Sequence, residues 1–249
     1  MAQAQFENKV ALVTGAGSGM GRSTAVLLAK RGAAVTIVGR RENKLHDVAA
    51  EIIANGGRVL AVPGDVSKPA DVENAVKRTV DEFGALHYAV NNAGISGVFT
   101  PLHEESIEDW HRVIETDLSS VFYGLKYEIP AILAAGGGAV VNVSSVFADR
   151  GHQPREYAAS KHGIRGITRS AAIEYGPQGI RVNELQPGVI DTEMTQANPE
   201  GTQEVANTGI PQRRVGTGEE IATAVAFLLS DDASYVNGAH LAVDGGFLA

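Results

Sequence analysis

Residues 10–21 read Val-Ala-Leu-Val-Thr-Gly-Ala-Gly-Ser-Gly-Met-Gly, and the fold prediction starts from this stretch. The first five residues are apolar or β-branched, as in a buried strand, and the residues after Gly21 have the composition of a helix. A strand, a glycine-rich turn and a helix in this order predict a binding site for a dinucleotide pyrophosphate, held by free N–H groups at the helix start. Gly15 then allows the tight turn, Gly19 lets the backbone approach the phosphates, and Gly21 lets the helix pack close to the sheet. A flexible turn without a ligand is the alternative.

Short apolar runs alternate with helical segments along the rest of the chain. The runs are nearly all apolar rather than alternating, which is typical of strands buried on both faces of a sheet. They lie at Lys9–Thr14, Ala34–Val38, Arg58–Val62, Leu86–Val90, Ala139–Val143, Ile180–Leu185 and Leu241–Val243. The helical segments between them are Met20–Arg31, Glu42–Asn55, Pro69–Phe83, Ile107–Ala134, Glu156–Tyr175 and Gly218–Leu229. This order predicts an α/β fold, a single doubly wound, Rossmann-type domain over residues 1–249 with a seven-stranded parallel sheet and helices on both faces.

Two segments depart from this alternation. Ile107–Ala134 is longer than an ordinary helix, and we expect a bend or two helices there, with Pro130 near the far end. Residues 193–215 are polar, contain two prolines and two glycines, and show only weak helical patterning. A stretch of this length without a clear element is usually a lid or a binding loop. We therefore expect a substrate loop or lid at about residues 193–215.

The composition excludes several classes of protein. The chain has 249 residues, a formal net charge of −8 and no cysteine, so disulfides, Cys-ligated zinc and a thiol nucleophile are ruled out. The negative charge argues against a nucleic-acid partner, and the seven histidines show no metal-ligand spacing, so we assign no metal. No apolar run reaches the roughly 20 residues of a membrane span, and the first residues lack the pattern of a signal peptide. We therefore expect a cytoplasmic protein with no membrane partner.

The end of the second predicted strand bears on the choice of cofactor. An acidic residue at this place in a dinucleotide fold bonds the ribose 2′-hydroxyl of NAD, whereas arginine accommodates the 2′-phosphate of NADP. The sequence is Val38-Gly39-Arg40-Arg41, which offers no carboxylate and two guanidinium groups suited to a phosphate. Two solvated arginines are the alternative, although positive charge at a helix start is unfavourable against the helix dipole. We therefore predict NADP(H) in preference to NAD(H), with Arg40 and Arg41 among its contacts.

Tyr157 and Lys161 lie four residues apart in a predicted helix, and hence on one of its faces. A free tyrosine ionises only near pH 10, and a lysine ammonium one helical turn away lowers the cost of the phenolate. An ordinary amphipathic pair is the alternative when the two residues are considered alone. Ser144 and Ser145 follow the fifth predicted strand, at the edge where open α/β sheets bind ligands. A serine there can hydrogen-bond a carbonyl oxygen on which negative charge develops.

With these motifs in place, the whole chain resembles the short form of the short-chain dehydrogenase/reductase family. The matching motifs, in chain order, are Thr14-Gly-x-x-x-Gly-x-Gly21, Gly64-Asp65-Val66, Asn91-Asn-Ala-Gly94, Ser144-Ser145, Tyr157-x-x-x-Lys161, Pro187-Gly188 and Val243-Asp-Gly-Gly246. The resemblance implies that Tyr157 is the general acid/base and that a serine orients the substrate. It implies that Lys161 bonds the nicotinamide ribose and eases ionisation of the tyrosine. It also implies a homotetramer in which the C-terminal tail packs at a subunit interface.

The resemblance implies further contacts with the cofactor. Asp65 and Val66 are similar to the pair that bracket adenine, and the segment 92–94 resembles the one that lines the adenine ribose. The segment 187–192 resembles the stretch that holds the nicotinamide carboxamide, through the backbone of Ile190 and the hydroxyl of Thr192. The complete set predicted to contact the cofactor is Gly15, Ser18, Gly19, Met20, Gly21, Arg40, Arg41, Asp65, Val66, Asn92, Ala93, Gly94, Tyr157, Lys161, Pro187, Gly188, Ile190 and Thr192.

Asp117 departs from the family pattern. The family usually has asparagine in the segment that reads Glu-Thr-Asp-Leu at 115–118, where its amide helps to hold a water in a proton relay to the lysine. Asp117 can accept hydrogen bonds in the same place, but it brings a negative charge close to Lys161. We therefore place Asp117 among the catalytic residues, with Ser145, Tyr157 and Lys161, and predict catalysis with an altered pH profile.

The spacing from serine to tyrosine also departs from the family pattern. The usual gap is 13 residues, which Ser144 satisfies, whereas Ser145 lies 12 residues before Tyr157. Counting along the strand instead favours Ser145, the second serine of the pair. The loop at 146–156 loses a residue easily, but slipping the strand by one would turn every side chain to the opposite face. We therefore predict that Ser145 is the catalytic serine.

The loops beside the serine and the tyrosine are expected to hold the substrate. The residues predicted to contact it are Ser145, Phe147, His152 and Tyr157. Its identity is not predicted, because the determinants lie in the loops that vary most within such a fold. Glu184 also departs from the family pattern, since the family tends to carry a small or apolar residue there, and we expect it to pair with an unidentified cation.

Together these features predict an oxidoreductase, a carbonyl reductase or alcohol dehydrogenase that interconverts a small-molecule secondary alcohol and a ketone by hydride transfer. The alternative within the family is a 3-oxoacyl-[acyl-carrier-protein] reductase of fatty-acid synthesis. Its acidic carrier would dock on basic residues, for which the candidates are Arg165, Arg169, Arg213 and Arg214. The alternative from another class is a nucleotide-sensing protein that has the fold without the chemistry. The intact Tyr157–Lys161 pair argues against such a sensor.

Overall fold

The predicted strands form one parallel sheet. In the computed structural model, which describes residues 5–151 and 154–249, they are β1 (Val10–Thr14), β2 (Ala34–Gly39), β3 (Arg58–Pro63), β4 (Tyr88–Asn91), β5 (Gly138–Val143), β6 (Ile180–Pro187) and β7 (His240–Val243). Their order across the sheet is β3-β2-β1-β4-β5-β6-β7, and all neighbours are parallel. The direction of winding reverses between β1 and β4, the kind of position at which doubly wound sheets bind ligands. The predicted fold class is confirmed.

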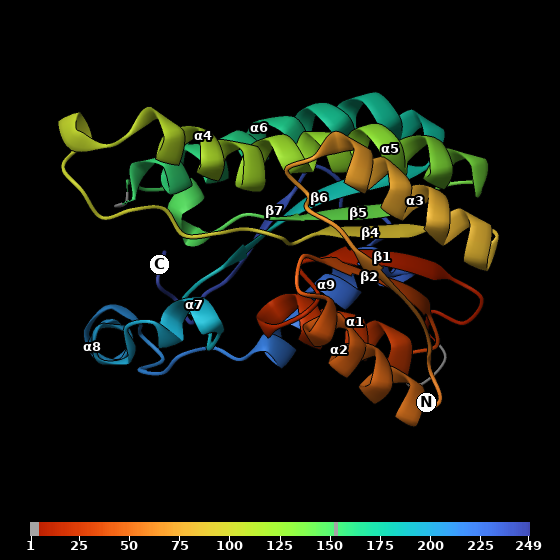
Figure 1. Cartoon of the computed structure of the whole chain (residues 1–249), viewed down its shortest axis with the longest axis horizontal. Coiled ribbons are helices and arrows are strands. Elements are labelled where there is room, and N and C mark those ends of the chain that lie inside the picture. The colour runs from red at the N-terminus through yellow and green to blue at the C-terminus, as the bar shows by residue number, and fades with distance from the viewer. Residues whose placement is uncertain (1–4, 152–153) are drawn as a thin grey trace.

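Helices cover both faces of the sheet. In Figure 1, α1 (Gly19–Lys30), α2 (Glu42–Ala54) and α9 (Gly218–Leu229) lie below it, and α3 (Pro69–Phe83), α4 (Ile107–Ile114), α5 (Ser120–Ala134) and α6 (Arg155–Tyr175) lie above it. Successive strand residues point into the two resulting cores, as Val13 and Leu12 of β1 do. Burial on both faces explains the nearly continuous apolar runs. None of the helices within the described ranges is both long and apolar enough to cross a membrane.

The long helical segment is interrupted, in agreement with the expected bend. A π-helical turn, Glu115–Ser119, separates α4 from α5, whereas Pro130 lies inside α5 without ending it. A π-helical turn inserts an extra residue and so changes the direction of the side chains around it. The turn contains Asp117, whose side chain is completely buried. The irregular geometry therefore occurs where a carboxylate enters the protein interior.

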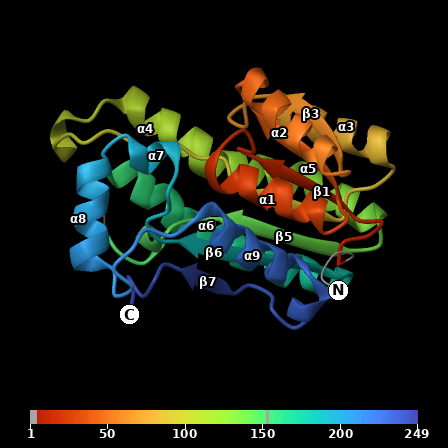
Figure 2. The same ribbon diagram turned by 90° about the horizontal axis from the view of Figure 1, so that it is seen from below.

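The predicted lid differs from the expectation, because it contains two helices, α7 (Glu193–Gln196) and α8 (Pro199–Gly209). Each follows a capping residue, Thr192 for α7 and Asn198 for α8. Within these two helices only Ala206 is buried, so the apolar periodicity that identifies a helix is weak. Figures 1 and 2 show both helices beyond the ends of the strands, with α8 on the side of the C-terminus.

Candidate active site

The glycine turn between β1 and α1 has no room for side chains at two of its positions. Gly15 has a φ of +65°, and a Cβ atom there would lie 2.8 Å from Nδ2 of Asn92. A Cβ atom at Gly21 would lie 2.4 Å from the carbonyl oxygen of Gly15. The chain therefore folds back tightly at the start of α1 and presents backbone to the strand ends. Such a turn suits a pyrophosphate bound at a helix N-terminus.

Thr14 ties the glycine turn to the end of β4. Its hydroxyl oxygen accepts hydrogen bonds from the backbone N–H groups of Asn92, at 3.0 Å, and Ala93, at 3.1 Å. The side-chain amide of Asn92 donates in return to the carbonyl oxygen of Thr14, at 2.9 Å. These bonds hold two of the predicted cofactor segments together. The sequence analysis gave Thr14 no role of its own, and its only signal was its place at the start of the glycine motif.

A cleft of about 630 Å³ runs along the carboxyl ends of the strands. Of the residues predicted to contact the cofactor, all but Gly21 line it: Gly15, Ser18, Gly19, Met20, Arg40, Arg41, Asp65, Val66, Asn92, Ala93, Gly94, Tyr157, Lys161, Pro187, Gly188, Ile190 and Thr192. Gly21 lies behind the turn, against Gly15. Residues that come together from six separate segments of the chain thus form one elongated site, whose backbone-lined turn and paired arginines fit a dinucleotide.

Arg41 lies in this cleft in contact with the start of α7. One of its guanidinium nitrogens, Nη2, is 2.7 Å from Oε2 of Glu193 and 3.0 Å from the hydroxyl oxygen of Ser18. The hydrogen bond from Arg41 lowers the pKa of Glu193, so this carboxylate is charged at neutral pH. Since Glu193 is the first residue of α7, the ion pair joins this helix to the loop after β2. Glu193 was not among the predicted site residues, and its only signal in the sequence was its position in the predicted lid.

Tyr157 and Lys161 lie one turn apart on α6, and both face the cleft. The Lys161 ammonium is 5.0 Å from the centre of the Tyr157 ring, and the lysine is only 3% exposed. A Cβ atom at Gly94 would lie 3.3 Å from Nζ of Lys161, so the glycine makes room for the ammonium. The structure thus places a buried cation beside the phenol of Tyr157, as the spacing of the two residues predicts.

Asp117 is a buried counter-ion for Lys161. Its Oδ2 lies 3.2 Å from Nζ of Lys161, and its Oδ1 accepts a hydrogen bond from the backbone N–H of Ile95 at 2.8 Å. Burial by itself lowers the pKa of Lys161, but the charge of Asp117, the charge of Tyr157 and the hydrogen bond to Asp117 together outweigh this effect, so the pKa is raised. Burial also raises the pKa of Asp117, and Lys161 opposes that rise only in part. The structure thus brings the two residues together as the sequence predicts.

Ser144 and Ser145 have different surroundings at the end of β5. The hydroxyl of Ser144 donates a hydrogen bond to Oε1 of Glu184 at 2.5 Å and lies 3.2 Å from the carbonyl oxygen of Leu185. It is therefore turned toward β6. The hydroxyl oxygen of Ser145 accepts a hydrogen bond from the backbone N–H of Phe147, at 3.3 Å. Because an accepting hydroxyl still carries a proton to donate, these surroundings favour Ser145 as the substrate-binding serine.

Aromatic side chains surround the tyrosine. The rings of Phe147 and Tyr157 meet edge to face, with centroids 6.5 Å apart, and Phe247 lies 6.2 Å beyond Phe147. The guanidinium of Arg150 lies 5.0 Å from the centre of the Phe247 ring. Phe247 was not among the predicted site residues, because nothing near it in the sequence indicates that the C-terminal tail reaches the loop after β5. The predicted substrate residue His152 lies outside the described residues.

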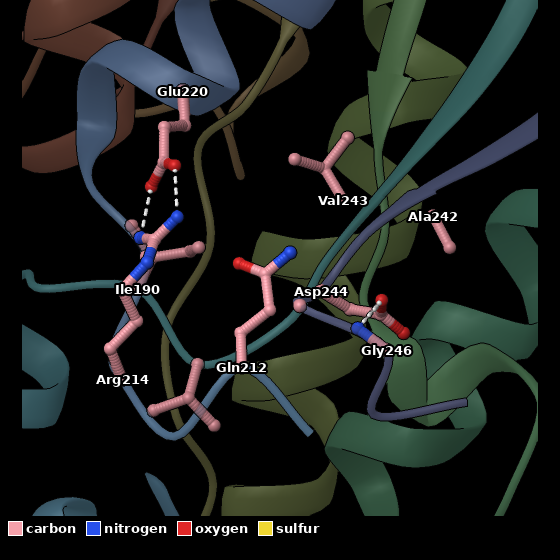
Figure 3. Close-up of a pocket in the computed structure, with 11 residues that line it drawn as sticks. Ile190, Gln212, Arg214, Glu220, Ala242, Val243, Asp244 and Gly246 are labelled. Atoms are coloured by element: carbon pink, nitrogen blue, oxygen red, sulfur yellow. Dashed lines mark hydrogen bonds and ion pairs between the residues drawn. The ribbon is translucent and has the colours of Figure 1, made fainter. Parts of the chain in front are cut away.

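Two arginines considered for carrier docking are engaged within the chain. Arg165 is the cation expected for Glu184, with Nε of the arginine 2.9 Å from Oε2 of the glutamate, and its side chain is only 15% exposed. Arg214 donates to both carboxylate oxygens of Glu220, at 2.9 and 2.6 Å, beside a second pocket of about 350 Å³ (Figure 3). Arg165 is therefore not available to an external partner, and Arg214 is available only if this ion pair opens.

Comparison with known proteins identifies the family of the chain. A family model described as enoyl-(acyl carrier protein) reductase matches residues 15–248. Cyclohexanol dehydrogenase of Acinetobacter sp. (strain SE19) is 47% identical over 244 residues, which cover 98% of this chain and 96% of that protein. This chain belongs to the short-chain dehydrogenase/reductase family. The family expected from the motifs is confirmed.

Other members with similar sequences have related names. Cis-4-hydroxycyclohexanecarboxylate dehydrogenase of Sinomonas cyclohexanicum is 44% identical over 245 residues, which cover 98% of each chain. The crystal structure of levodione reductase superposes with a TM-score of 0.92 at 40% identity, covering 97% of this chain and 98% of the other. This short-chain dehydrogenase/reductase is accordingly an oxidoreductase that interconverts a secondary alcohol and a ketone with NAD(P)(H).

Proposed function

We propose that this dehydrogenase acts on alicyclic secondary alcohols and ketones, with a six-membered ring as the preferred frame, and prefers NADP(H). The observation that carries the chemistry is the buried Lys161 ammonium beside the Tyr157 ring at the inner wall of the cleft. The ring preference is supported by the names of two relatives, a cyclohexanol dehydrogenase and a hydroxycyclohexanecarboxylate dehydrogenase. The rings of Phe147 and Phe247 add apolar surface near the tyrosine, against which an alicyclic ring can pack.

The chain's own residues control the oxygen and the proton of the substrate. Bound NADP(H) supplies the hydride or accepts it. In ketone reduction the Tyr157 hydroxyl donates a proton to the carbonyl oxygen, and in alcohol oxidation its phenolate accepts the hydroxyl proton. Ser145 donates a hydrogen bond to the same oxygen, where negative charge develops. Lys161 stabilises the phenolate, and Asp117 keeps Lys161 charged in a buried place.

The preference for NADP(H) rests on Arg40 and Arg41. Both guanidinium groups line the cleft after β2, where the fold places the ribose 2′ position. Arg41 already has an anionic partner in Glu193. A 2′-phosphate therefore has to displace the Glu193 carboxylate from Arg41 or share Arg41 with it. Where the carboxylate is displaced, the free energy of binding NADPH includes the loss of this ion pair.

The proposal also covers the oligomeric state of the protein and its location in the cell. We propose a cytoplasmic homotetramer that uses the β7 edge and the tail after it. In the single chain, β7 is an edge strand in which His240 and Ala242 are exposed. An edge strand with free backbone groups is usually covered by another element. Light scattering at several protein concentrations tests the tetramer, and a monomer at all concentrations would contradict it.

The substrate proposal is tested with NADPH and NADH against a matched panel of substrates. The panel contains cyclohexanone, cyclohexanol, 4-hydroxycyclohexanecarboxylate, an open-chain methyl ketone and an acetoacetyl thioester that mimics an acyl carrier. We expect the highest kcat/KM with the ring compounds and NADP(H). Tyr157→Phe should lower kcat by about 10²- to 10⁴-fold, the usual contribution of a positioned general acid, while the Kd for NADPH stays within about twofold.

The other outcomes separate the alternatives. A preference for the thioester over the ring ketones would favour the carrier-protein reductase. Tight NADPH binding without turnover of any substrate would favour the sensor. A Tyr157→Phe variant with undiminished kcat would contradict the mechanism, whatever the substrate.

A further inference from the structure

A partly buried network of charged side chains lies next to the cleft, and the proposed chemistry makes no direct use of it. Its centre is Arg165 on α6, which contacts Glu184 in β6 and Asp149 in the loop after β5. Glu184 is only 1% exposed. Ser144 and Gln186 complete the network. The network therefore joins three separate segments of the chain at the wall that carries the serines.

The guanidinium of Arg165 balances the negative charges of the Glu184 and Asp149 carboxylates. A carboxylate buried as deeply as that of Glu184 is unstable unless it is paired and hydrogen-bonded. Arg165 donates to Glu184 from Nε at 2.9 Å and from Nη2 at 3.3 Å. It also donates to Asp149, from Nη2 at 3.0 Å and from Nη1 through a shorter contact. One side chain can do this because a guanidinium presents five N–H donors in a fixed plane, which a lysine does not.

The network holds the chain on both sides of the Ser145 hydroxyl. Before it, the Ser144 hydroxyl donates to Glu184 at 2.5 Å. After it, the Gln186 side-chain amide donates to Asp149 Oδ2 at 2.8 Å and contacts the carbonyl oxygen of Ser145 at 3.4 Å. Three points of the loop that follows β5 are thus attached to β6. The position of Ser145 is therefore fixed by neighbours that do not touch the substrate.

The same network is attached to the helix that carries the tyrosine. Tyr157, Lys161 and Arg165 succeed one another at intervals of four residues in α6, so they lie along one side of the helix. A single rigid helix thus carries the general acid at one point and the anchor of the serine loop two turns later. Any shift of the loop relative to this helix changes the separation of the Ser145 and Tyr157 hydroxyls.

We propose that Arg165, acting through Asp149 and Glu184, is a positioning residue that makes the Ser145 and Tyr157 hydroxyls converge on one substrate oxygen. The inference rests on the proposed function, because it assigns those two hydroxyls to a common substrate. Small displacements of catalytic groups are costly, and a shift of about 1 Å can lower a rate by about 10²-fold. Arg165 thereby influences turnover without contact with the substrate.

The first experiment compares two arginines of α6. Arg165→Met removes the anchor, and Arg169→Met is the matched control, because Arg169 lies one turn further on and is exposed. We expect Arg165→Met to lower kcat for cyclohexanone reduction by about 10- to 100-fold, with the Kd for NADPH within about twofold. Arg169→Met should leave both constants within about twofold of the parent enzyme. Arg165→Lys keeps the charge but loses the planar fork, so its kcat should fall between those of the parent and Arg165→Met.

The second experiment repeats these substitutions in a Ser145→Ala background. If Arg165 acts by placing Ser145, its loss matters little once the serine hydroxyl is gone, and the further decrease in kcat should be less than about threefold. A merely structural role predicts the opposite, because losses from independent causes multiply. If Arg165→Met fails to fold, the comparison of Arg165→Lys in the two backgrounds decides the question.

The outcomes separate this inference from the proposed function. If Ser145→Ala leaves kcat for ring ketones unchanged, the assignment of Ser145 is wrong, and the inference fails with it. If Ser145→Ala lowers kcat but the Arg165 variants keep a kcat within about threefold of that of the parent enzyme, the inference alone is wrong. Losses that multiply in the Ser145→Ala background would also overturn it.

Discussion

The two ends of the active-site cleft each contain an ion pair, one exposed to solvent and one buried. Near β2, Arg41 and Glu193 form an ion pair whose side chains are 51% and 50% exposed. Beside α6, the side chains of Lys161 and Asp117 are 4% and 0% exposed. An exposed pair contributes at most about 1 kcal/mol and weakens in salt, whereas removal of one partner of a buried pair costs about 3–5 kcal/mol. The first end can exchange partners when a charged ligand arrives, while the second has its charges fixed beforehand.

After Tyr157→Phe, the largest expected effect also lies at the buried end, and it distinguishes the two serines. Ser145→Ala should lower kcat by about 10²- to 10³-fold, because it removes a donor to the substrate oxygen. Ser144→Ala should cost at most about tenfold, because that hydroxyl is bonded to Glu184 rather than to substrate. Steady-state kcat for both variants under one set of conditions decides between them. A larger loss for Ser144→Ala would reverse the assignment.

The next effect concerns the charge on Asp117. Asp117→Asn removes a negative charge 3.2 Å from the Lys161 ammonium. Asp117 raises the pKa of Lys161, so its removal should move the alkaline limb of the pH profile for alcohol oxidation to lower pH.

The measurement is kcat against pH for the parent enzyme and for two variants. Asp109→Asn is the matched control, since Asp109 pairs with Arg112 at the exposed surface of α4. Its profile should coincide with that of the parent enzyme. If the Asp117→Asn profile also coincides, Asp117 does not influence the proton transfer.

A smaller effect is expected at the exposed end of the cleft. Arg41→Met should raise the KM for NADPH by about fivefold and leave that for NADH within about twofold, since about 1 kcal/mol corresponds to about fivefold. Glu193→Gln should lower the KM for NADPH, by less than about fivefold, because Arg41 no longer has a competing anion. Both effects should shrink in about 0.5 M salt.

Glu51→Gln is the control for this end, because Glu51 forms a similarly exposed ion pair with Arg22. It should leave the KM for both cofactors unchanged. A Glu193→Gln variant that binds NADPH more weakly would show that the lid carboxylate assists the cofactor rather than competing with it. Equal effects of Arg41→Met on NADPH and NADH would contradict the proposed contact with the 2′-phosphate.

The smallest effect on turnover, and a clear one on stability, is expected at Glu128 in α5. Burial raises the pKa of Glu128 from its ordinary value of 4.5 to about 7, and the hydrogen bond from Asn91 opposes this only in part. The folded protein therefore binds a proton that the unfolded chain releases between these values. The free energy of unfolding should fall by about 3 kcal/mol as the pH rises from about 4.5 to about 7.

Glu128→Gln removes this titration. The variant should match the parent enzyme near pH 4.5 and exceed it in Tm above about pH 7, with kcat unchanged. Glu82→Gln, at an exposed position of α3, should leave the dependence of Tm on pH as it is. A parallel pH dependence in the parent enzyme and Glu128→Gln would show that another group titrates.

The fold, and most of the residues that line the cleft, could be predicted from local sequence patterns. Strands buried on both faces appear as apolar runs, the glycine turn marks the start of α1, and Tyr157 and Lys161 share a helix face because they are four residues apart. Each of these signals is local, and the geometry of a helix, a strand or a tight turn follows from short stretches of chain. The order of the motifs along the chain then identified the family.

Tertiary structure alone decided which distant side chains meet. The pairing of Glu184 with Arg165, the contact of Arg41 with Glu193 and the approach of Phe247 to Phe147 join separate segments. No periodicity encodes such contacts, because they depend on how strands and helices pack. The helices of the lid escaped prediction for a related reason, since they bury almost no apolar surface. Local sequence patterns therefore indicate where the chain turns and which groups lie in the cleft. The packing of strands and helices determines which charged side chains are buried.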